Sequence, residues 1–153
     1  MRVSDVTLSV LDVGHGNSAV LLDTEGVGVI DCGPGTALLE FLRQTGVRHV
    51  DVVLISHADR DHIEGVVALL ESEEYTIGRL RLNSDALKTS QLWNDLVYLL
   101  DQAHSARDLD FQPALTTGDT GSYDQGVVRV EVLAPRPALA AIGRPVNLRV
   151  KLP

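Results

Sequence analysis

"VDVVLISHADRDHIEG", residues 50–65, joins an apolar run of strand length to a cluster of polar side chains. The run VDVVLIS is typical of a central strand that is covered on both faces. After the cluster, apolar residues recur at the spacing of one helix face: Ile63, Val66, Val67 and Leu70. This spacing predicts an amphipathic helix, so the cluster lies at a strand-to-helix turn. In α/β sheets, the carboxyl edge of the strands is where ligands usually bind.

Four side chains of metal-binding type lie in the short segment between this strand and this helix: His57, Asp59, Asp61 and His62. Imidazole nitrogen together with carboxylate oxygen suits zinc, manganese or iron. His57 and Asp59 are two positions apart, so an extended backbone points both the same way. Asp61 and His62 lie at the helix start, where the turn can direct them toward a second centre. The cluster predicts a cofactor of one or two divalent ions, zinc or manganese, as in two-metal hydrolysis.

An ordinary helix start is the alternative interpretation of the same residues. Asp59 or Asp61 would then be the N-cap, and both histidines would lie in solvent. A single His or Asp would fit this alternative well, but four ligand-type residues at these spacings favour a metal site.

Composition bounds the class of protein. At 153 residues the chain fits one domain, and 44% of its residues are apolar, as in a globular fold. The formal net charge of −8 predicts no broad basic surface for nucleic acid. Cys32 is the only cysteine, which leaves no disulfide and no cysteine zinc site. The apolar runs are far shorter than the roughly 18 residues that span a bilayer, and the start, MRVSDVTLSV, lacks the apolar segment of a signal peptide. We therefore expect a cytoplasmic protein that does not bind a membrane.

Periodicity along the rest of the chain alternates between strand and helix. It predicts strands in DVTLSVLDV, SAVLLD, VGVID, RLRLN, VVRVEVL and VNLRVKL, with a hairpin turn at residues 24–26. Helices are expected near residues 36–45, 61–72 and 88–105, the first of them capped by Thr36 and ended by Gly46. We expect the strands between residues 3 and 31 and the strand at 50–56 to form one mixed sheet, with the helices on its outer side.

The polar cluster and its flanks resemble a known family. HADRDH resembles the H-x-[HD]-x-D-H signature of the metallo-β-lactamase superfamily. LDVGHGNSAVLLDTEGVGVIDCG is similar to the opening of the ComEC-type competence-protein branch, whose pattern is L-D-V-G-Q-G-D-S followed by I-D-T-G. SHADRDHIEG looks like the histidine-aspartate loop of that branch, and VEVLAP with Asn147 matches its later strands. The chain departs from the branch at His15 and Asn17, which replace Gln and Asp, and at Glu64, which replaces Gly.

The resemblance implies an α+β fold, the αββα sandwich of metallo-β-lactamases, and a hydrolase that cleaves phosphodiesters, with nucleic acid as the leading substrate. It implies that the metal is held by all four residues of the cluster: His57, Asp59, Asp61 and His62. It also implies that Asp61 orients the attacking water. Asp59, where the superfamily more often has a second His, makes that part of the site richer in oxygen ligands.

The later metal ligands of the family have no clear counterpart in the chain. After His62 there is one histidine, His104, which is expected at the end of the long helix. The later Gly-Asp pair ends in Asp119, within a segment that is a turn by composition. Residues 1–153 are therefore interpreted as one domain truncated at its C-terminus, the first half to two thirds of the sandwich.

Two functions remain open from the sequence. The first is the metal-dependent hydrolase, acting through a metal-activated water. The second is a catalytically incomplete remnant or interaction module that a partner chain, or a second copy in a homo-oligomer, completes. Because the cluster offers only two ligands to each of two centres, we expect the isolated chain to bind metal poorly and to hydrolyse little.

Overall fold

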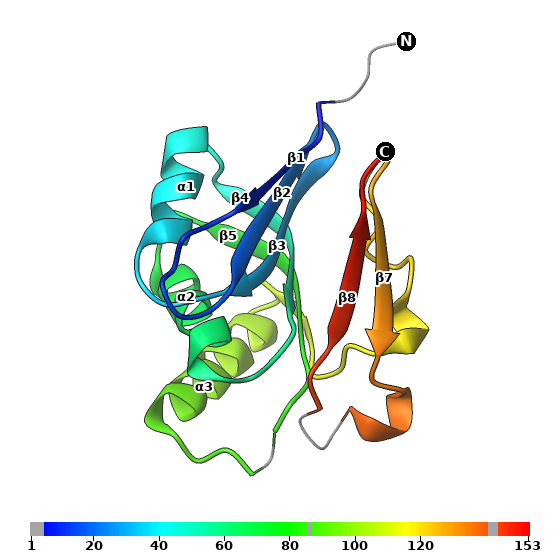
Figure 1. Cartoon of the computed structure of the whole chain (residues 1–153). Coiled ribbons are helices and arrows are strands. Elements are labelled where there is room, and N and C mark those ends of the chain that lie inside the picture. The colour runs from blue at the N-terminus through cyan, green and yellow to red at the C-terminus, as the bar shows by residue number, and fades with distance from the viewer. Residues whose placement is uncertain (1–4, 86, 141–143) are drawn as a thin grey trace.

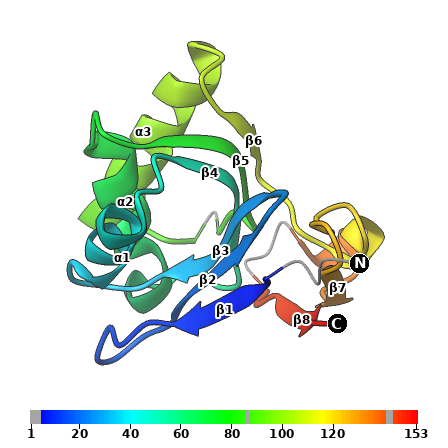
Figure 2. The same cartoon turned by 90° about the horizontal axis from the view of Figure 1, so that it is seen from above.

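The structure is a computed structural model that describes residues 5–85, 87–140 and 144–153. It has three layers: helices, a six-stranded sheet and a two-stranded sheet (Figures 1 and 2). The α+β class that the sequence predicts is confirmed. The predicted first strand began at residue 3, but residues 3 and 4 lie outside the described part, and the observed strand β1 begins at Thr7.

The large sheet is mixed, as predicted. Its strands run in the order β1 (Thr7–Val10), β2 (Ser18–Asp23), β3 (Gly26–Cys32), β4 (His49–Ile55), β5 (Thr76–Leu82) and β6 (Asp110–Gln112). The first three strands are antiparallel, and β3 to β6 are parallel. The strand at the start of the decisive stretch, β4, lies between β3 and β5, which confirms its central position. The sequence did not predict β6, because three residues at a sheet edge carry too little periodicity.

All three predicted helices cover one face of this sheet (Figure 2). They are α1 (Ala37–Thr45), α2 (Arg60–Glu71) and α3 (Gln91–Ser105). Their apolar sides form one core with the sheet, whose fully buried members include Val20, Val29, Leu42, Val53, Ile55, Ile63, Leu80 and Leu96. Gly46 ends α1 with a left-handed φ of 73°, as predicted. Thr36 lies at the N-cap position, but its side chain caps no backbone N–H; its hydroxyl donates instead to Glu40 Oε1 at 2.6 Å.

The opposite face of the large sheet is covered by the small antiparallel sheet of β7 (Arg129–Ala134) and β8 (Asn147–Lys151). A second core lies between the two sheets and contains Val52, Leu54, Leu115, Tyr123, Val130, Val132 and Val146. Two 3-10 turns, Thr117–Asp119 and Pro137–Leu139, flank β7. The backbone N–H of Val146 donates to Ser56 O at 2.6 Å, which ties the start of β8 to the end of β4.

Within the described ranges, no helix is both long enough and apolar enough to cross a membrane. Cys32 is fully buried at the end of β3. Its pKa is raised well above the usual value, first by burial and then by the adjacent Asp31. The thiol is therefore protonated at neutral pH, and the side chain is part of the core beside the helices.

Candidate metal centre

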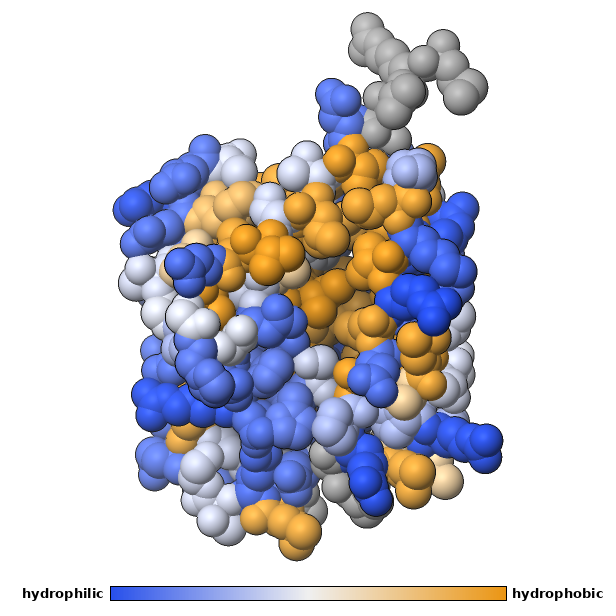
Figure 3. Space-filling model, in the orientation of Figure 1, coloured by the Kyte–Doolittle hydropathy of each residue, from blue (hydrophilic) through white to orange (hydrophobic). Residues whose placement is uncertain are grey.

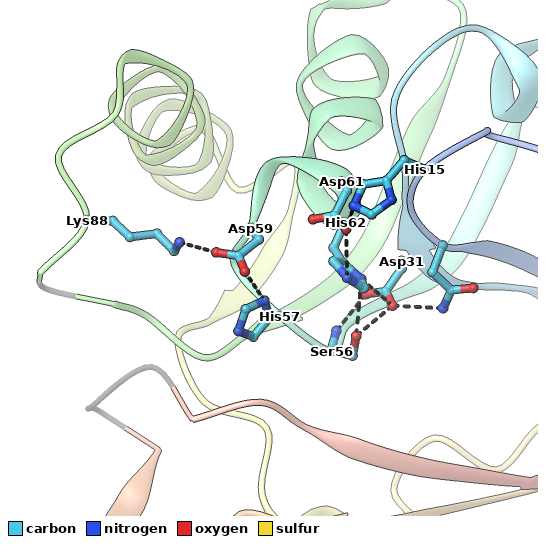
Figure 4. Close-up of polar contacts among 9 residues, drawn as sticks. His15, Asp31, Ser56, His57, Asp59, Asp61, His62 and Lys88 are labelled. Carbon is cyan, nitrogen blue, oxygen red and sulfur yellow. Dashed lines mark hydrogen bonds and ion pairs between the residues drawn. The ribbon is translucent and has the colours of Figure 1, made fainter.

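The polar cluster lies where β4 passes into α2, at the carboxyl edge of the parallel strands. Asp59 occupies the N-cap position of α2, with extended backbone angles of φ −85° and ψ 155°. Its carboxylate makes no capping hydrogen bond, so Asp59 is an N-cap by position only. The side chain is used in another way: it turns toward His57 and Lys88 (Figure 4).

His57 and Asp59 form one pair of ligand-type side chains, called here the first arm. His57 Nδ1 lies 2.6 Å from Asp59 Oδ2. The other carboxylate oxygen, Oδ1, is in an ion pair with the ammonium of Lys88, from the segment before α3. This hydrogen bond to Lys88 is the main cause of a lowered pKa of Asp59, and the charge of His57 acts in the same direction. Both oxygens of Asp59 are thus engaged.

Asp61 and His62 form the second arm, in the first turn of α2. Asp61 Oδ2 lies 3.6 Å from His62 Nε2. The other ring nitrogen of His62, Nδ1, lies 2.9 Å from Oδ2 of the buried Asp31. Because an ionised carboxylate can only accept, Nδ1 is the nitrogen that donates to Asp31, and in a neutral ring Nε2 is then the nitrogen with the lone pair, on the side of Asp61. Such a carboxylate behind a histidine is the usual support of a metal-binding imidazole.

Asp31 is the buried anchor of the second arm. It lies at the end of β3 and is fully buried. Its Oδ1 accepts from the backbone N–H of Ser56 at 2.7 Å, and its Oδ2 accepts from the Ser56 hydroxyl at 2.6 Å and from Asn17 Nδ2 at 3.0 Å. Its backbone has a φ of 57°, a left-handed conformation that aspartate adopts more readily than most residues. Asp31 therefore joins β3, the end of β4 and His62 at one point.

A third histidine approaches the second arm from the loop between β1 and β2. His15 Nε2 lies 3.7 Å from Asp61 Oδ2, the same oxygen that faces His62. The His15 side chain is 99% exposed, whereas the Asp61 side chain is 29% exposed. Figure 4 shows the His15 ring beside Asp61, on the opposite side of the cluster from Lys88.

Comparison with known proteins agrees with this arrangement. The profile of the metallo-beta-lactamase superfamily matches residues 11–137, most of the chain and the whole cluster. The chain belongs to this superfamily. Ribonuclease Z of Clostridioides difficile (strain 630) is 36% identical over 69 residues, which are 44% of this chain and 21% of that protein. Ribonuclease Z of Clostridium tetani (strain Massachusetts / E88) is 39% identical over 54 residues, 35% of this chain and 17% of that protein.

A solved structure shows a similar fold. The crystal structure of a new diphosphatase from the PhnP family aligns with a TM-score of 0.51 and 11% identity, over 88% of this chain and 48% of that chain. The chain thus spans about a fifth of the length of the curated relatives and about half of this structure. The predicted superfamily and fold class are confirmed, whereas the ComEC-type branch is not shown by these matches.

Members of this superfamily usually bind divalent metals, and the two arms differ in how well they fit one. Within the part of the chain that the structure describes, no three His, Cys, Asp or Glu side chains are already grouped closely enough to hold an ion. The second arm has the donor chemistry of a metal site, because His62 Nε2 is free and Asp31 fixes the ring. The first arm has suitable atoms, but Lys88 already neutralises Asp59.

The four predicted ligands are therefore brought to one sheet edge as two pairs. The rings of His57 and His62 meet edge-on, with their centroids 5.8 Å apart. Whether these residues bind metal stays a prediction. His104 lies in the last turn of α3, as expected, with Nδ1 3.2 Å from Leu109 O. Asp119 ends the 3-10 turn Thr117–Asp119 and caps the start of that turn, because its Oδ2 accepts from the backbone N–H of Thr116 at 2.8 Å.

Replacing Lys88 by methionine should raise the pKa of Asp59 toward its ordinary value, because the main cause of the lowered value is removed. The lowered pKa means that the ion pair stabilises the fold above the ordinary pKa of aspartate, and that this contribution is lost as the pH falls through the lower, folded value. An NMR titration of the Asp59 carboxyl carbon measures the shift. An unchanged Asp59 titration in Lys88→Met would show that the ion pair does not form in solution.

Proposed function

We propose that the chain belongs to a metal-dependent hydrolase that cleaves phosphodiesters, with nucleic acid as the substrate class. The observation that carries the proposal is the second arm: Asp61 beside the free Nε2 of a histidine fixed by a buried carboxylate, at the carboxyl edge of β4. A divalent ion there supplies a polarising charge and a water of lowered pKa. The name of the two ribonuclease Z relatives supports nucleic acid as the substrate, while the net charge of −8 adds no attraction for it.

The residues of the cluster have distinct proposed roles. His57, Asp59, Asp61 and His62 are the metal ligands that the family motif places in this loop. Asp61 also accepts a hydrogen bond from the attacking water and so orients it toward phosphorus. The finer assignment to the ComEC-type branch rests on the stretches around Val13 and Ile30 that resemble it, and is part of the proposal. Zinc and manganese are the proposed ions, because the donor set combines imidazole with carboxylate.

We expect the purified chain to cleave bis(p-nitrophenyl) phosphate slowly in the presence of zinc or manganese, and Asp61→Asn to reduce the rate at least about 100-fold. The amide keeps the size of Asp61 but loses the charge that binds metal and water. Glu64→Gln is the matched control. Glu64 lies one turn further along α2 and pairs with Arg60 at 2.9 Å, so its loss should change the rate less than about twofold. Turnover that persists in EDTA, or that Asp61→Asn leaves intact, would contradict the proposal.

A second candidate function is an interaction module that a second copy or a partner chain completes. In the described part of the chain, β8 pairs only with β7, so its other edge is free. Apolar side chains gather beside it, over β1, β2 and β8 (Figure 3). Leu8 pairs with Leu21, whose side chain faces the second sheet, so the Leu8 side chain lies on that same face. Val10, two residues further along β1, is on this face too and is 74% exposed. An open strand edge next to exposed apolar surface favours association.

On this second candidate, Val10→Asp should shift the chain from an associated species to a monomer, because it places a charge on the apolar face. Sedimentation velocity across a concentration series measures the change. Tyr98→Asp is the control, since Tyr98 is also exposed but lies on α3, on the far side of the large sheet. Two results would exclude this face as the interface. One is a wild-type chain that stays monomeric at every concentration, and the other is association that Val10→Asp leaves unchanged.

A further inference from the structure

The two arms of the cluster differ in their charge balance. On the first arm, one oxygen of Asp59 meets His57 and the other meets the Lys88 ammonium. A positive charge from the protein therefore already lies where a cation would be attracted. On the second arm, Asp61 faces two imidazoles, His62 and His15, and no Lys or Arg among the described residues pairs with it. The second arm thus keeps a carboxylate and two imidazoles available for an ion.

The loop that carries His15 is fixed against the second arm through its backbone. The N–H of Asn17 donates to the carbonyl of Asp61 at 3.2 Å. Gly16 lies so close that a Cβ at this position would come within 2.4 Å of the same carbonyl, and its φ of 140° also favours glycine. Asn17 is tied in turn to Asp31 through its side-chain amide. His15 is thus held next to Asp61 by its neighbours, while its own ring is free to turn.

The distances from Asp61 to the two histidines are close to the distance between two ligand atoms that bind the same zinc ion. Asp61 Oδ2 lies 3.6 Å from His62 Nε2 and 3.7 Å from His15 Nε2. Two atoms that bind one zinc ion at about 2.0–2.1 Å lie about 3.3 Å apart in a tetrahedral site. Each pair must therefore close by only a few tenths of an ångström. Rotation of the exposed His15 ring can close its distance to Asp61, and a small rotation of the Asp61 carboxylate can close the distance to His62, both without a change of the backbone.

We propose that the chain binds a single divalent ion through His15, Asp61 and His62, and that the Lys88 ammonium takes the place of a second ion on the first arm. This inference rests on the metal dependence in the proposed function and revises its ligand set, because His15 replaces His57 and Asp59 as a ligand of the bound ion. It raises the number of protein ligands at the second arm from two to three, the number that a catalytic zinc site ordinarily keeps. The third ligand comes from before the cluster in the chain.

The test of His15 is zinc binding to the metal-free protein, measured by isothermal titration calorimetry against a competing chelator. The wild-type chain should bind one zinc ion, and His15→Ala should bind it at least about tenfold more weakly. His49→Ala is a matched control, because His49 Nε2 also lies 3.7 Å from a carboxylate, Oδ1 of Asp51, and is also exposed. Its zinc affinity should equal that of the wild type. Long-range ¹H–¹⁵N NMR should show zinc shifting Nε2 of His15.

The test of Lys88 is the stoichiometry of zinc binding. Lys88→Met removes the ammonium and should let the first arm bind, so that the titration reaches two ions per chain. Lys88→Arg keeps the positive charge and should stay at one. A wild-type chain that binds two ions overturns the role of Lys88, and so does a Lys88→Met chain that binds one. A His15→Ala chain with wild-type affinity overturns the role of His15.

Failure of this inference and failure of the proposed function can be told apart. Binding of one zinc ion through His15 without phosphodiester cleavage leaves the inference standing and contradicts hydrolysis by this chain. Metal-dependent cleavage that His15→Ala leaves unchanged in both rate and zinc affinity contradicts the inference alone. A chain that binds no zinc at all overturns both. Thermal unfolding of the metal-free variants confirms that each is folded, since the His15 side chain is 99% exposed and its removal should cost little stability.

Discussion

Replacing Asp31 by asparagine should lower the free energy of unfolding by about 3 kcal/mol and weaken zinc binding about 10- to 100-fold. The Asp31 side chain is fully buried, and both of its oxygens act as acceptors. Oδ1 accepts from the Ser56 N–H, and Oδ2 accepts from the Asn17 amide. In asparagine, an NH₂ group replaces one of the two oxygens and would face one of these donors. Neither the NH₂ group nor the donor that it faces would then have an acceptor. Urea denaturation measures the first effect, and calorimetric titration with zinc measures the second.

Asp51→Asn is the control for this expectation. Asp51 also joins β3 to β4, because its Oδ2 accepts from the backbone N–H of Val27 at 2.7 Å. Its side chain is 43% exposed, so water can replace the lost interaction. We expect a loss below about 1 kcal/mol and an unchanged zinc affinity. Equal losses in the two variants would mean that burial of Asp31 contributes nothing beyond an ordinary strand-to-strand hydrogen bond.

The strand and the helix next to the cluster could be predicted from the sequence, because the spacing of apolar residues along a segment shows which of its faces are buried. The apolar run around Val53 is covered on both faces, and β4 is indeed central. The spacing of Ile63 and Val66 places one side of α2 on the sheet, and both residues are buried. The sequence motif then fixes the position of the cluster, because a segment that links a central strand to its helix must lie at the sheet edge.

The partners of the cluster could not be predicted in the same way, because they come from distant parts of the chain. Lys88 lies in the segment before α3 and pairs with Asp59, and no sequence pattern around Lys88 predicts this contact. His15 precedes the cluster by more than forty residues, and only the path of the β1–β2 loop brings it next to Asp61. Asp31 did carry a signal: a carboxylate within an apolar strand is seldom buried without a specific partner.

The side of the sheet on which Arg81 points also depends on distant residues. Alternation in RLRLN places Arg79 and Arg81 on one face, and that face proves to be the one toward the second sheet. Arg81 is 4% exposed and donates to Tyr123 Oη at 2.8 Å and to Asp110 Oδ2 at 2.8 Å. Burial alone would lower the pKa of its guanidinium, but the hydrogen bonds to Asp110 and Tyr123 outweigh this and raise it. The charged side chain thus joins β5, the edge strand β6 and the inter-sheet core.

Arg81→Ala should therefore lower the free energy of unfolding by about 3 kcal/mol, because it leaves the Tyr123 hydroxyl and the Asp110 carboxylate without their buried partner. Urea denaturation measures the loss, and the near-ultraviolet circular dichroism difference between the chain and its Tyr123→Phe variant reports whether the small sheet still packs on the large one. Arg79→Ala is the matched control on the same strand and face. Arg79 lies over the Tyr123 ring at 5.4 Å, and its hydrogen bond to Ser122 O is long at 3.5 Å. Its loss should cost less than about 1 kcal/mol. If Arg79→Ala proved as costly as Arg81→Ala, stacking on Tyr123 rather than the hydrogen bonds of the buried Arg81 guanidinium would be what holds the two sheets together.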